Sequence, residues 1–347
     1  MRRFLIIALL LVATAPLSAA VYDLPAEGHD VVGAVATIIA AYDDTLVDIA
    51  RRHGLGYQDI VRANPGVNVW LPGEGTEIVL PNRFVLPPGP RVGLILNLAE
   101  FRMYYFPEAK AGEVAKVHTY PMSIGRMDWE TPLGNTSIVA MAKNPTWYPP
   151  QSVRDEHAAD GDPLPRVVPP GPDNPLGTRA LRLGIPGYLI HGTNRPAGVG
   201  MRVSHGCVRM FPEDVEFLFD RIRVKTAVRI INVPVKIGWD GEMLVAEVHP
   251  LLEVPQRLPD ETAEKIEQLD ADVELPDIES LSKEPLTYAI EQFIIATAER
   301  AGRMDWDRIE ALIQRADGIP GAVGGVQPGT GWTTTSIKNA ATSAAFE

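Results

Sequence analysis

Short apolar runs rich in β-branched residues, separated by glycine and proline, dominate the middle of this chain. The 30 glycines and 31 prolines favour strands, turns and long loops over a helical bundle. The clearest runs lie at 92–98, 103–106, 115–124, 136–141, 188–191 and 227–233. One helix is predicted to begin at Pro212, with two acidic residues in its first turn. The pattern therefore predicts an α+β fold whose central domain is a β-rich mixed sheet.

The charge and cysteine content argue against several classes of protein. The formal net charge of −12 disfavours sequence-independent binding of nucleic acid. A single cysteine, Cys207, leaves no internal disulfide framework and no multi-cysteine metal cage. We therefore expect no nucleic-acid partner, and the thiol is either buried and inert or used in chemistry.

Residues 1–20 have the pattern of an export signal. Two arginines precede an uninterrupted apolar run over 4–12, and small residues end at Ala20, after which we place the cleavage. The alternative is a membrane anchor, but the run is shorter than the roughly 20 residues that a membrane span needs. We therefore expect the mature protein to lie outside the cytoplasm.

Residues 34–81 are predicted to form a small βααβ unit. Thr45 is placed to cap one helix, a second helix is expected over 57–63, and a strand returns before Pro81. This order, with Asp44-Thr45-Leu46, Ala63-Asn64-Pro65 and Leu80-Pro81, resembles a LysM domain, a module that binds N-acetylglucosamine-containing glycan. The alternative is a generic small α+β domain. The resemblance implies glycan contacts for these residues: Thr45, Leu46, Asn64 and Pro65.

The rest of the chain divides by composition into a stiff proline-rich linker, the β-rich domain, an acidic and partly helical extension, and a disordered tail. The predicted bounds of these segments are 82–90, 91–233, 234–316 and 317–347. Two helices are expected in the extension, near 286–300 and 306–315. Within the β-rich domain, a proline-rich excursion over 144–184 contains Trp147 and Tyr148 and is predicted to be a lid.

The residues around Cys207 have the composition of a nucleophilic site. Cys207 lies in Ser204-His205-Gly206-Cys207-Val208-Arg209, and His191 ends an apolar run that continues as Gly192-Thr193-Asn194. A thiol nucleophile needs a base to become a thiolate, and the base in turn needs a group that orients it. Gly206 permits a sharp turn, so that amides near the thiol can bind an oxyanion.

Two other uses of these residues stay open at this point. An inert buried cysteine is common, although the polar, glycine-rich neighbours are unlike a core. A zinc site of His191, His205 and Cys207 is also conceivable, because three ligands and a water suit catalytic zinc.

The same motifs resemble the L,D-transpeptidases with a YkuD-type catalytic domain, in the branch that combines a signal peptide, a LysM module and this domain. The resemblance implies that Cys207 is the nucleophile, His191 the proton donor and acceptor, and the Gly192 carbonyl the group that orients His191. It places His205 and Gly206 in the oxyanion pocket. Residues that would contact substrate are Arg209, Ser204, Asn194, Trp147 and Tyr148. An ion pair with Glu213 or Asp214 is the alternative use of Arg209.

The implied reaction is a transfer of peptidoglycan tetrapeptide stems through a Cys207 thioester to an amine, in the periplasm, with no metal or organic cofactor. The favoured acceptor is the lysine of an outer-membrane lipoprotein or another envelope protein, and the second is diaminopimelate, which would give 3–3 crosslinks. Two alternatives remain: an L,D-carboxypeptidase that hydrolyses the same thioester, and a non-catalytic LysM protein that binds the wall.

Overall fold

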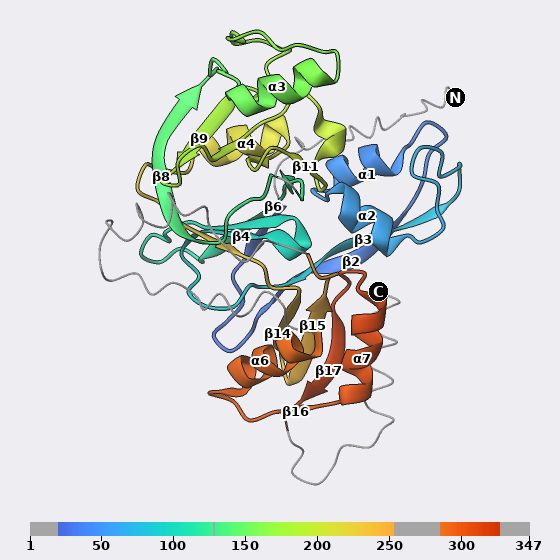
Figure 1. Ribbon diagram of the computed structural model, residues 1–347. Coiled ribbons are helices and arrows are strands. Elements are labelled where there is room, and N and C mark those ends of the chain that lie inside the picture. The colour runs from blue at the N-terminus through green and yellow to red at the C-terminus, as the bar shows by residue number, and fades with distance from the viewer. Residues whose placement is uncertain (1–19, 128, 253–284, 327–347) are drawn as a thin grey trace, which may run out of the picture.

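The computed structural model describes residues 20–127, 129–252 and 285–326 (Figure 1). Its centre is a curled nine-stranded sheet in the order β1-β6-β5-β4-β13-β8-β9-β10-β12. The strands are β1 (Ala20–Asp23), β4 (Gly93–Asn97), β5 (Arg102–Phe106), β6 (Lys116–Pro121), β8 (Gly134–Lys143), β9 (Arg179–Leu183), β10 (Leu189–His191), β12 (Val208–Arg209) and β13 (Ala227–Ile231). Most neighbours are antiparallel, but β13 with β4 and β10 with β12 are parallel. The predicted β-rich mixed sheet is confirmed.

The main core lies between this sheet and α4 (Pro212–Phe219), the helix predicted from its proline and acidic first turn. Val215 and Leu218 of α4 are fully buried against apolar side chains from the sheet, including Ile190 and Val208. A second pair of short parallel strands, β7 (Ile124–Gly125) and β11 (Arg202–Ser204), leads into the loop that carries Cys207. Residues buried beneath that loop therefore fix the backbone from which the thiol extends.

The βααβ unit consists of β2 (Val31–Ile39), α1 (Leu46–Arg52), α2 (Tyr57–Ala63) and β3 (Glu77–Val85). Both predicted helices are present, and the Asp48 N–H donates to the Thr45 side chain at the start of α1. The strands are longer than predicted, so β3 runs into the segment expected to be a linker. The reason is continuous pairing of β2 with β3, from Val31 opposite Val85 to Ile39 opposite Glu77.

This unit shares a hydrophobic core with the central sheet. Its buried Phe84 and Leu86 pack in the same cluster as Ile95, Tyr104 and other residues of β4, β5 and β6. Near the catalytic loop, the Tyr57 N–H donates to the Val199 carbonyl at 2.9 Å. A β-carbon on Gly200, whose φ is +91°, would lie 2.4 Å from the Tyr57 nitrogen. The unit is thus packed onto the central domain rather than joined to it by a free linker.

The C-terminal extension forms an antiparallel sheet in the order β14-β15-β17-β16, covered by two helices (Figure 1). Its elements are β14 (Val235–Asp240), β15 (Met243–Val248), α6 (Pro285–Thr297), β16 (Arg303–Met304), α7 (Trp306–Arg315) and β17 (Gly321–Gly325). The two helices agree with the prediction, but the prediction of a disordered tail from residue 317 is wrong for residues 317–326. The glycine-rich β17 is ordered because it pairs with both β15 and β16 and buries Val323. The acidic stretch over 260–284 lies outside the described residues.

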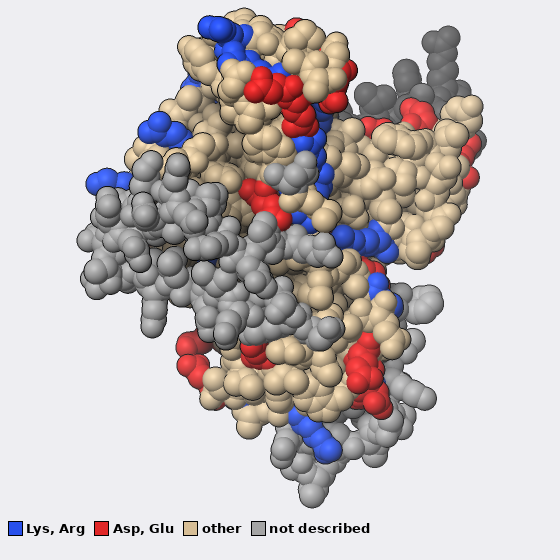
Figure 2. All heavy atoms as spheres, viewed as in Figure 1, with Lys and Arg blue, Asp and Glu red and all other residues tan. Residues whose placement is uncertain are grey.

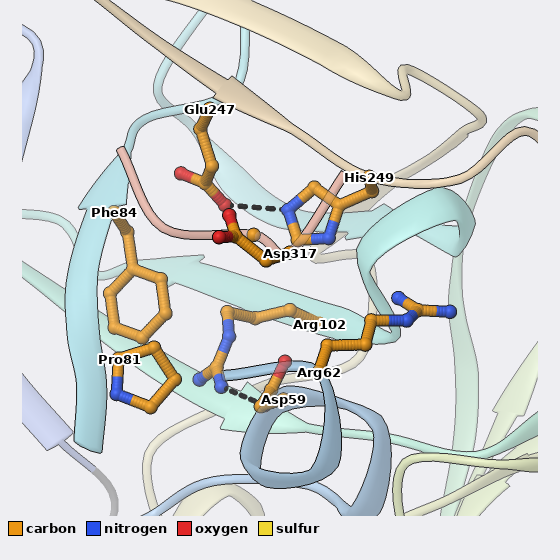
Figure 3. A pocket seen from close by; sticks show the side chains of 9 residues that line it. Asp59, Arg62, Pro81, Phe84, Arg102, Glu247, His249 and Asp317 are labelled. Carbon is orange, nitrogen blue, oxygen red and sulfur yellow. Dashed lines mark hydrogen bonds and ion pairs between the residues drawn. The ribbon is translucent and has the colours of Figure 1, made fainter. Parts of the chain in front are cut away.

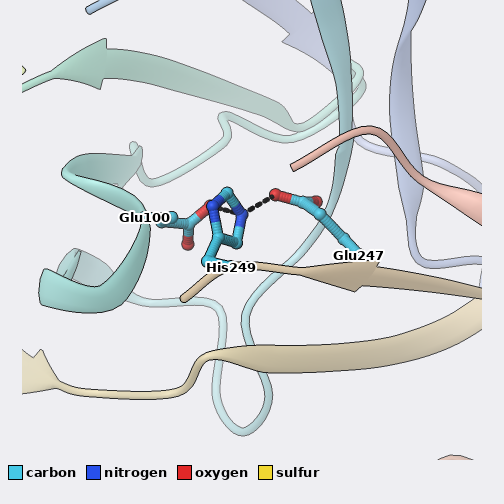
Figure 4. A group of neighbouring side chains, drawn as sticks. All are labelled: Glu100, Glu247 and His249. Atoms are coloured by element: carbon cyan, nitrogen blue, oxygen red, sulfur yellow. Dashed lines mark hydrogen bonds and ion pairs between the residues drawn. The ribbon is translucent and has the colours of Figure 1, made fainter. Parts of the chain in front are cut away.

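A cluster of buried charges lies where the three units meet. The Lys236 ammonium is 2.6 Å from Glu100 and 3.1 Å from Glu247. His249 lies between the two carboxylates and is 2.7 Å from Glu247 (Figure 4). Beside it is a cavity of about 10 Å³, lined by residues of α2, β3, β5 and the extension, including the ion pair of Arg102 with Asp59 (Figure 3). A cavity of this size holds at most one water. These contacts are structural, and they hold the units in one arrangement.

Within the described residues, no helix is long and apolar enough to cross a membrane. The predicted export signal falls almost entirely on residues 1–19, which are outside the description. On the face shown in Figure 2, acidic and basic side chains lie side by side over α3 (Gln151–Ala159) at the top of the molecule.

Candidate active site

The parallel pairing of β10 with β12 brings His191 and Cys207 to one face of the sheet. Ile190 lies opposite Val208, and His191 lies opposite Arg209. Because Ile190 and Val208 point into the main core, alternation along the strands turns His191, Arg209 and the preceding Cys207 to the other face. The two candidate catalytic residues, 16 positions apart in the sequence, thus lie at the end of β10 and immediately before the neighbouring β12.

A tight turn presents the thiol. Gly206 has a φ of +93°, and a β-carbon there would lie 2.8 Å from the ring of Tyr188. The Gly206 carbonyl accepts a hydrogen bond from buried Thr131 at 2.8 Å. Since C=O and N–H point in opposite directions across a trans peptide, this bond directs the Cys207 N–H away from Thr131. The geometry is compatible with the predicted role of this turn in binding an oxyanion.

The orientation of His191 follows from a single contact. Its Nδ1 lies 2.6 Å from the Gly192 carbonyl. A carbonyl can only accept, so Nδ1 carries the proton and Nε2 is left as the basic nitrogen. Burial, followed by the charge of Arg209, lowers the pKa of His191 to about 3. The imidazole is therefore neutral across the physiological pH range, with the lone pair of Nε2 unprotonated.

Cys207 is half-buried, and burial raises the pKa of its thiol above the ordinary value. A backbone hydrogen bond from Leu189 and the charge of Arg209 oppose this effect only in part. The thiol proton faces the Gly187 carbonyl, with Sγ 3.7 Å from that oxygen. In the free protein the pair is thus a thiol beside a neutral imidazole, not a thiolate–imidazolium ion pair.

These pKa values predict the pH dependence of alkylation by iodoacetamide. The rate should rise with pH toward an inflection above that of the unfolded chain, because only the thiolate reacts and burial raises the pKa of the Cys207 thiol. No step is expected between pH 5 and 8, since His191 stays neutral throughout this range. The measurement is the alkylation rate from pH 5 to 10.5, with urea-unfolded protein as the reference. Fast alkylation that persists at pH 5 would instead indicate an ion pair and contradict this assignment.

The ring of His205 is held by groups that the sequence did not indicate. Its Nε2 is 2.9 Å from Glu156 on α3, and its ring makes an edge contact with Trp129 at a centroid distance of 5.2 Å. The predicted excursion over 144–184 therefore contains a helix, and that helix contacts the catalytic loop. Thr131, Glu156 and Arg126 were all missed, because nothing in their local sequence marks them.

The other predicted substrate residues lie at different depths around this loop. Arg209 is largely buried, and its Nε has no hydrogen-bond partner among the described residues. Its alternative partner Glu213 binds Arg51 of α1 instead, at 2.7 and 2.8 Å. Buried Ser204 donates to the Cys207 carbonyl, which makes it a support of the turn.

The remaining substrate residues lie farther along the chain from the thiol. Asn194 donates to the Asp173 carbonyl at 3.1 Å. Trp147 pairs with Val168 through its backbone, and Tyr148 is largely exposed.

Two of the four predicted glycan contacts are wrong on grounds of burial. Leu46 is fully buried, and the Asn64 amide is engaged by backbone groups of Ile60 and Val79. Both therefore stabilise the βααβ unit and cannot reach a ligand. Thr45 caps α1, and Pro65 is exposed.

One group of side chains among the described residues has the composition of a metal site: Glu100, Glu247 and His249 (Figure 4). The Lys236 ammonium already supplies the positive charge between the two carboxylates. The residues at this position therefore do not fit an additional cation. Cys207 does not belong to this group.

Comparison with known proteins identifies the family. The model of the YkuD L,D-transpeptidase catalytic domain matches residues 91–233. The chain is 36% identical over 313 residues to the "Probable L,D-transpeptidase ErfK/SrfK" of Salmonella typhimurium, covering 89% of this chain and 92% of that protein. It is 41% identical over 239 residues to the "Probable L,D-transpeptidase YbiS" of Escherichia coli, covering 67% and 76%. A crystal structure of L,D-transpeptidase 3 from Mycobacterium tuberculosis is 18% identical over 44% of this chain and 66% of that chain, with a TM-score of 0.29.

The chain therefore belongs to the L,D-transpeptidase family, and the predicted resemblance is confirmed. It is an L,D-transpeptidase of the type represented by ErfK and YbiS, a family that acts on peptidoglycan.

Proposed function

We propose that the protein is a periplasmic enzyme that forms a thioester between Cys207 and a peptidoglycan tetrapeptide stem, and then transfers the stem to an amine. The observation that carries this proposal is the arrangement of His191. Its Nδ1–H is bound to the Gly192 carbonyl, its Nε2 is basic, and it lies on the same sheet face as Cys207. This is the arrangement that a cysteine nucleophile requires.

The first half-reaction forms the thioester. As Sγ of Cys207 attacks the carbonyl before the terminal D-alanine, its proton passes to Nε2 of His191. The carbonyl oxygen becomes an oxyanion, toward which the Cys207 N–H can donate. Collapse breaks the C–N bond, and His191 returns the proton to the departing amine of D-alanine.

The second half-reaction uses the same groups in reverse. An amine attacks the thioester, and its proton passes to Nε2 of His191 while the new amide bond forms. The C–S bond breaks, and the proton on His191 neutralises the departing thiolate. Because His191 is neutral at rest, it can act as the acceptor in both halves.

For the acceptor we favour a lysine of an outer-membrane lipoprotein, or of another envelope protein, over diaminopimelate of a second stem. Both are primary amines, so the thioester chemistry does not separate them. Selection between an extended protein tail and a glycan-bearing stem must therefore come from the residues around Cys207.

The test is a reaction of purified protein with tetrapeptide muropeptides, with a lysine-terminated peptide and with diaminopimelate as competing acceptors. We expect D-alanine release together with an amide product, and more lysine adduct than 3–3 dimer. Release of D-alanine with tripeptide as the sole product would instead establish hydrolysis. Exclusive 3–3 dimers would overturn the preferred acceptor.

We also propose that the βααβ unit is a LysM-type glycan-binding module. Support comes from two neighbouring loops at one end of the unit, which are joined by the hydrogen bond from the Leu46 N–H to the Val69 carbonyl. These loops expose the large side chains of Tyr42, Trp70 and Leu71. Exposed aromatic rings are suited to stacking on sugar rings.

A further inference from the structure

A carboxylate from α3 lies between two cationic or potentially cationic side chains next to the nucleophile. Glu156 Oε1 is 2.6 Å from Nη2 of Arg126, and its Oε2 is 2.9 Å from Nε2 of His205. The same Arg126 and His205 nitrogens are 3.5 Å apart, so both serve a single carboxylate. His205 is two residues before Cys207. A carboxylate is therefore bound within reach of the catalytic loop.

The catalytic domain holds Arg126 and His205 in place independently of Glu156. The main-chain N–H of Arg126 donates to the Ser204 carbonyl at 3.0 Å, directly after the pairing of β7 with β11. The His205 ring rests on Trp129. Both side chains keep some exposure, 34% for Arg126 and 20% for His205, so a ligand from solvent can reach them. The backbone of Arg126 and the ring of His205 therefore keep these contacts when the carboxylate is removed.

Glu156, in contrast, lies on α3, a short helix in the part of the excursion that precedes β9. The base of the excursion is closed by the pairing of Trp147 with Val168 and by Asn174, which donates to three of its carbonyls. In α3 itself, Val153 is the buried residue. A partly exposed ion pair of this kind contributes little net stability. Glu156 can therefore leave Arg126 and His205 without loss of the fold.

We propose that Arg126 and His205 form a binding site for a free carboxylate of the peptide substrate, and that Glu156 occupies this site until the substrate displaces it. The inference rests on the proposed function only in taking a stem peptide as the ligand. Such a stem carries carboxylates on its terminal D-alanine and on diaminopimelate. Arg209 adds a further positive charge nearby, since the charges of Arg126 and Arg209 act on each other. The site would favour stems with the free acid over their amidated forms.

The test measures binding of a synthetic tetrapeptide stem to the full mature chain carrying Cys207→Ala, by calorimetry, so that no acylation occurs. Adding Glu156→Gln should tighten binding about fivefold to tenfold, because the competing charge is removed. Adding Arg126→Gln should weaken it about tenfold or more. Asp155→Asn is the matched control, since Asp155 lies on the same helix and bonds only Gln151 among the described residues, and it should leave the affinity unchanged.

Two amidated stems, one at D-alanine and one at diaminopimelate, identify which carboxylate is bound. The carboxylate whose amidation abolishes the gain in affinity from Glu156→Gln is the group that the site recognises. Thermal melts of each variant, expected within a few degrees of the parent, separate binding from unfolding.

Unchanged or weaker binding with Glu156→Gln, or equal sensitivity of both amidated stems to Arg126→Gln, would overturn the inference. Tighter binding of the stem by Glu156→Gln in the Cys207→Ala background, together with no release of D-alanine by the protein that keeps Cys207, would keep the inference and overturn the proposed function. Normal turnover by the chain that keeps Cys207, with no effect of either Glu156→Gln or Arg126→Gln on KM, would keep the proposed function and overturn the inference.

Discussion

Replacing Cys207 by alanine is expected to lower the turnover of tetrapeptide stems by at least about 10⁴-fold. The thiol is the group that forms the covalent bond, and no second cysteine exists in the chain to replace it. The fold should survive, because Cys207 is half-buried at a loop and the change removes one atom. The measurement is D-alanine release by the variant, with a thermal melt to confirm that its Tm stays within a few degrees of the parent.

Cys207→Ser provides the conservative comparison. Serine keeps the shape of the side chain, but its hydroxyl is a much weaker nucleophile than a thiol, so the activity of this variant should also be nearly lost. Substantial activity in either variant would show that another residue is the nucleophile. A cysteine variant that fails to fold would instead point to a structural role for the thiol.

Deleting residues 20–88 is expected to abolish folding of the remaining chain. The deletion removes β1 from the edge of the central sheet, together with Phe84 and Leu86 from the shared core. It also removes Asp59 and Phe84, which are the ion-pair partner of Arg102 and the aromatic ring under its guanidinium. The central sheet would lose an edge strand and part of a shared core, and a domain that is stable by only roughly 5–15 kcal/mol is not expected to survive that loss.

The measurement for this deletion is a thermal melt of the shortened protein followed by circular dichroism. We expect no cooperative transition. A cooperative melt with normal turnover of soluble stems would show that the βααβ unit is an independent tether, as its linker-like sequence indicates. Glycan binding by the unit should therefore be measured with an exposed-side-chain variant such as Trp70→Ala, which leaves the core intact.

Local signals in the sequence were sufficient for most elements of the fold. The bounds of α2 and α7 agree with the predicted helices, because caps and prolines mark their ends. The linker over 82–90 and the tail from 317 were misjudged because their composition is that of exposed segments, whereas their order comes from distant partners. β3 extends by pairing with β2, and β17 is stabilised by β15.

The same distinction explains the outcome for the candidate site. Cys207, His191 and Gly192 lie in compact motifs, and the structure brings His191 and its carbonyl partner together as expected. Thr131 and Glu156 contact the catalytic loop from 75 and 49 positions away, so no short motif contains them. For Leu46 and Asn64 the motif led to the wrong role. Both were predicted to contact glycan, whereas in the structure they stabilise the fold of the βααβ unit.

The central claim is that a stem is held covalently on Cys207, and intact-mass spectrometry of the wild-type protein after incubation with a tetrapeptide stem tests it directly. We predict a mass increase equal to the stem minus D-alanine, located by peptide mapping on Cys207 and absent from the Cys207→Ala protein. An adduct that persists in Cys207→Ala, or D-alanine release at full rate by that variant, would contradict the account.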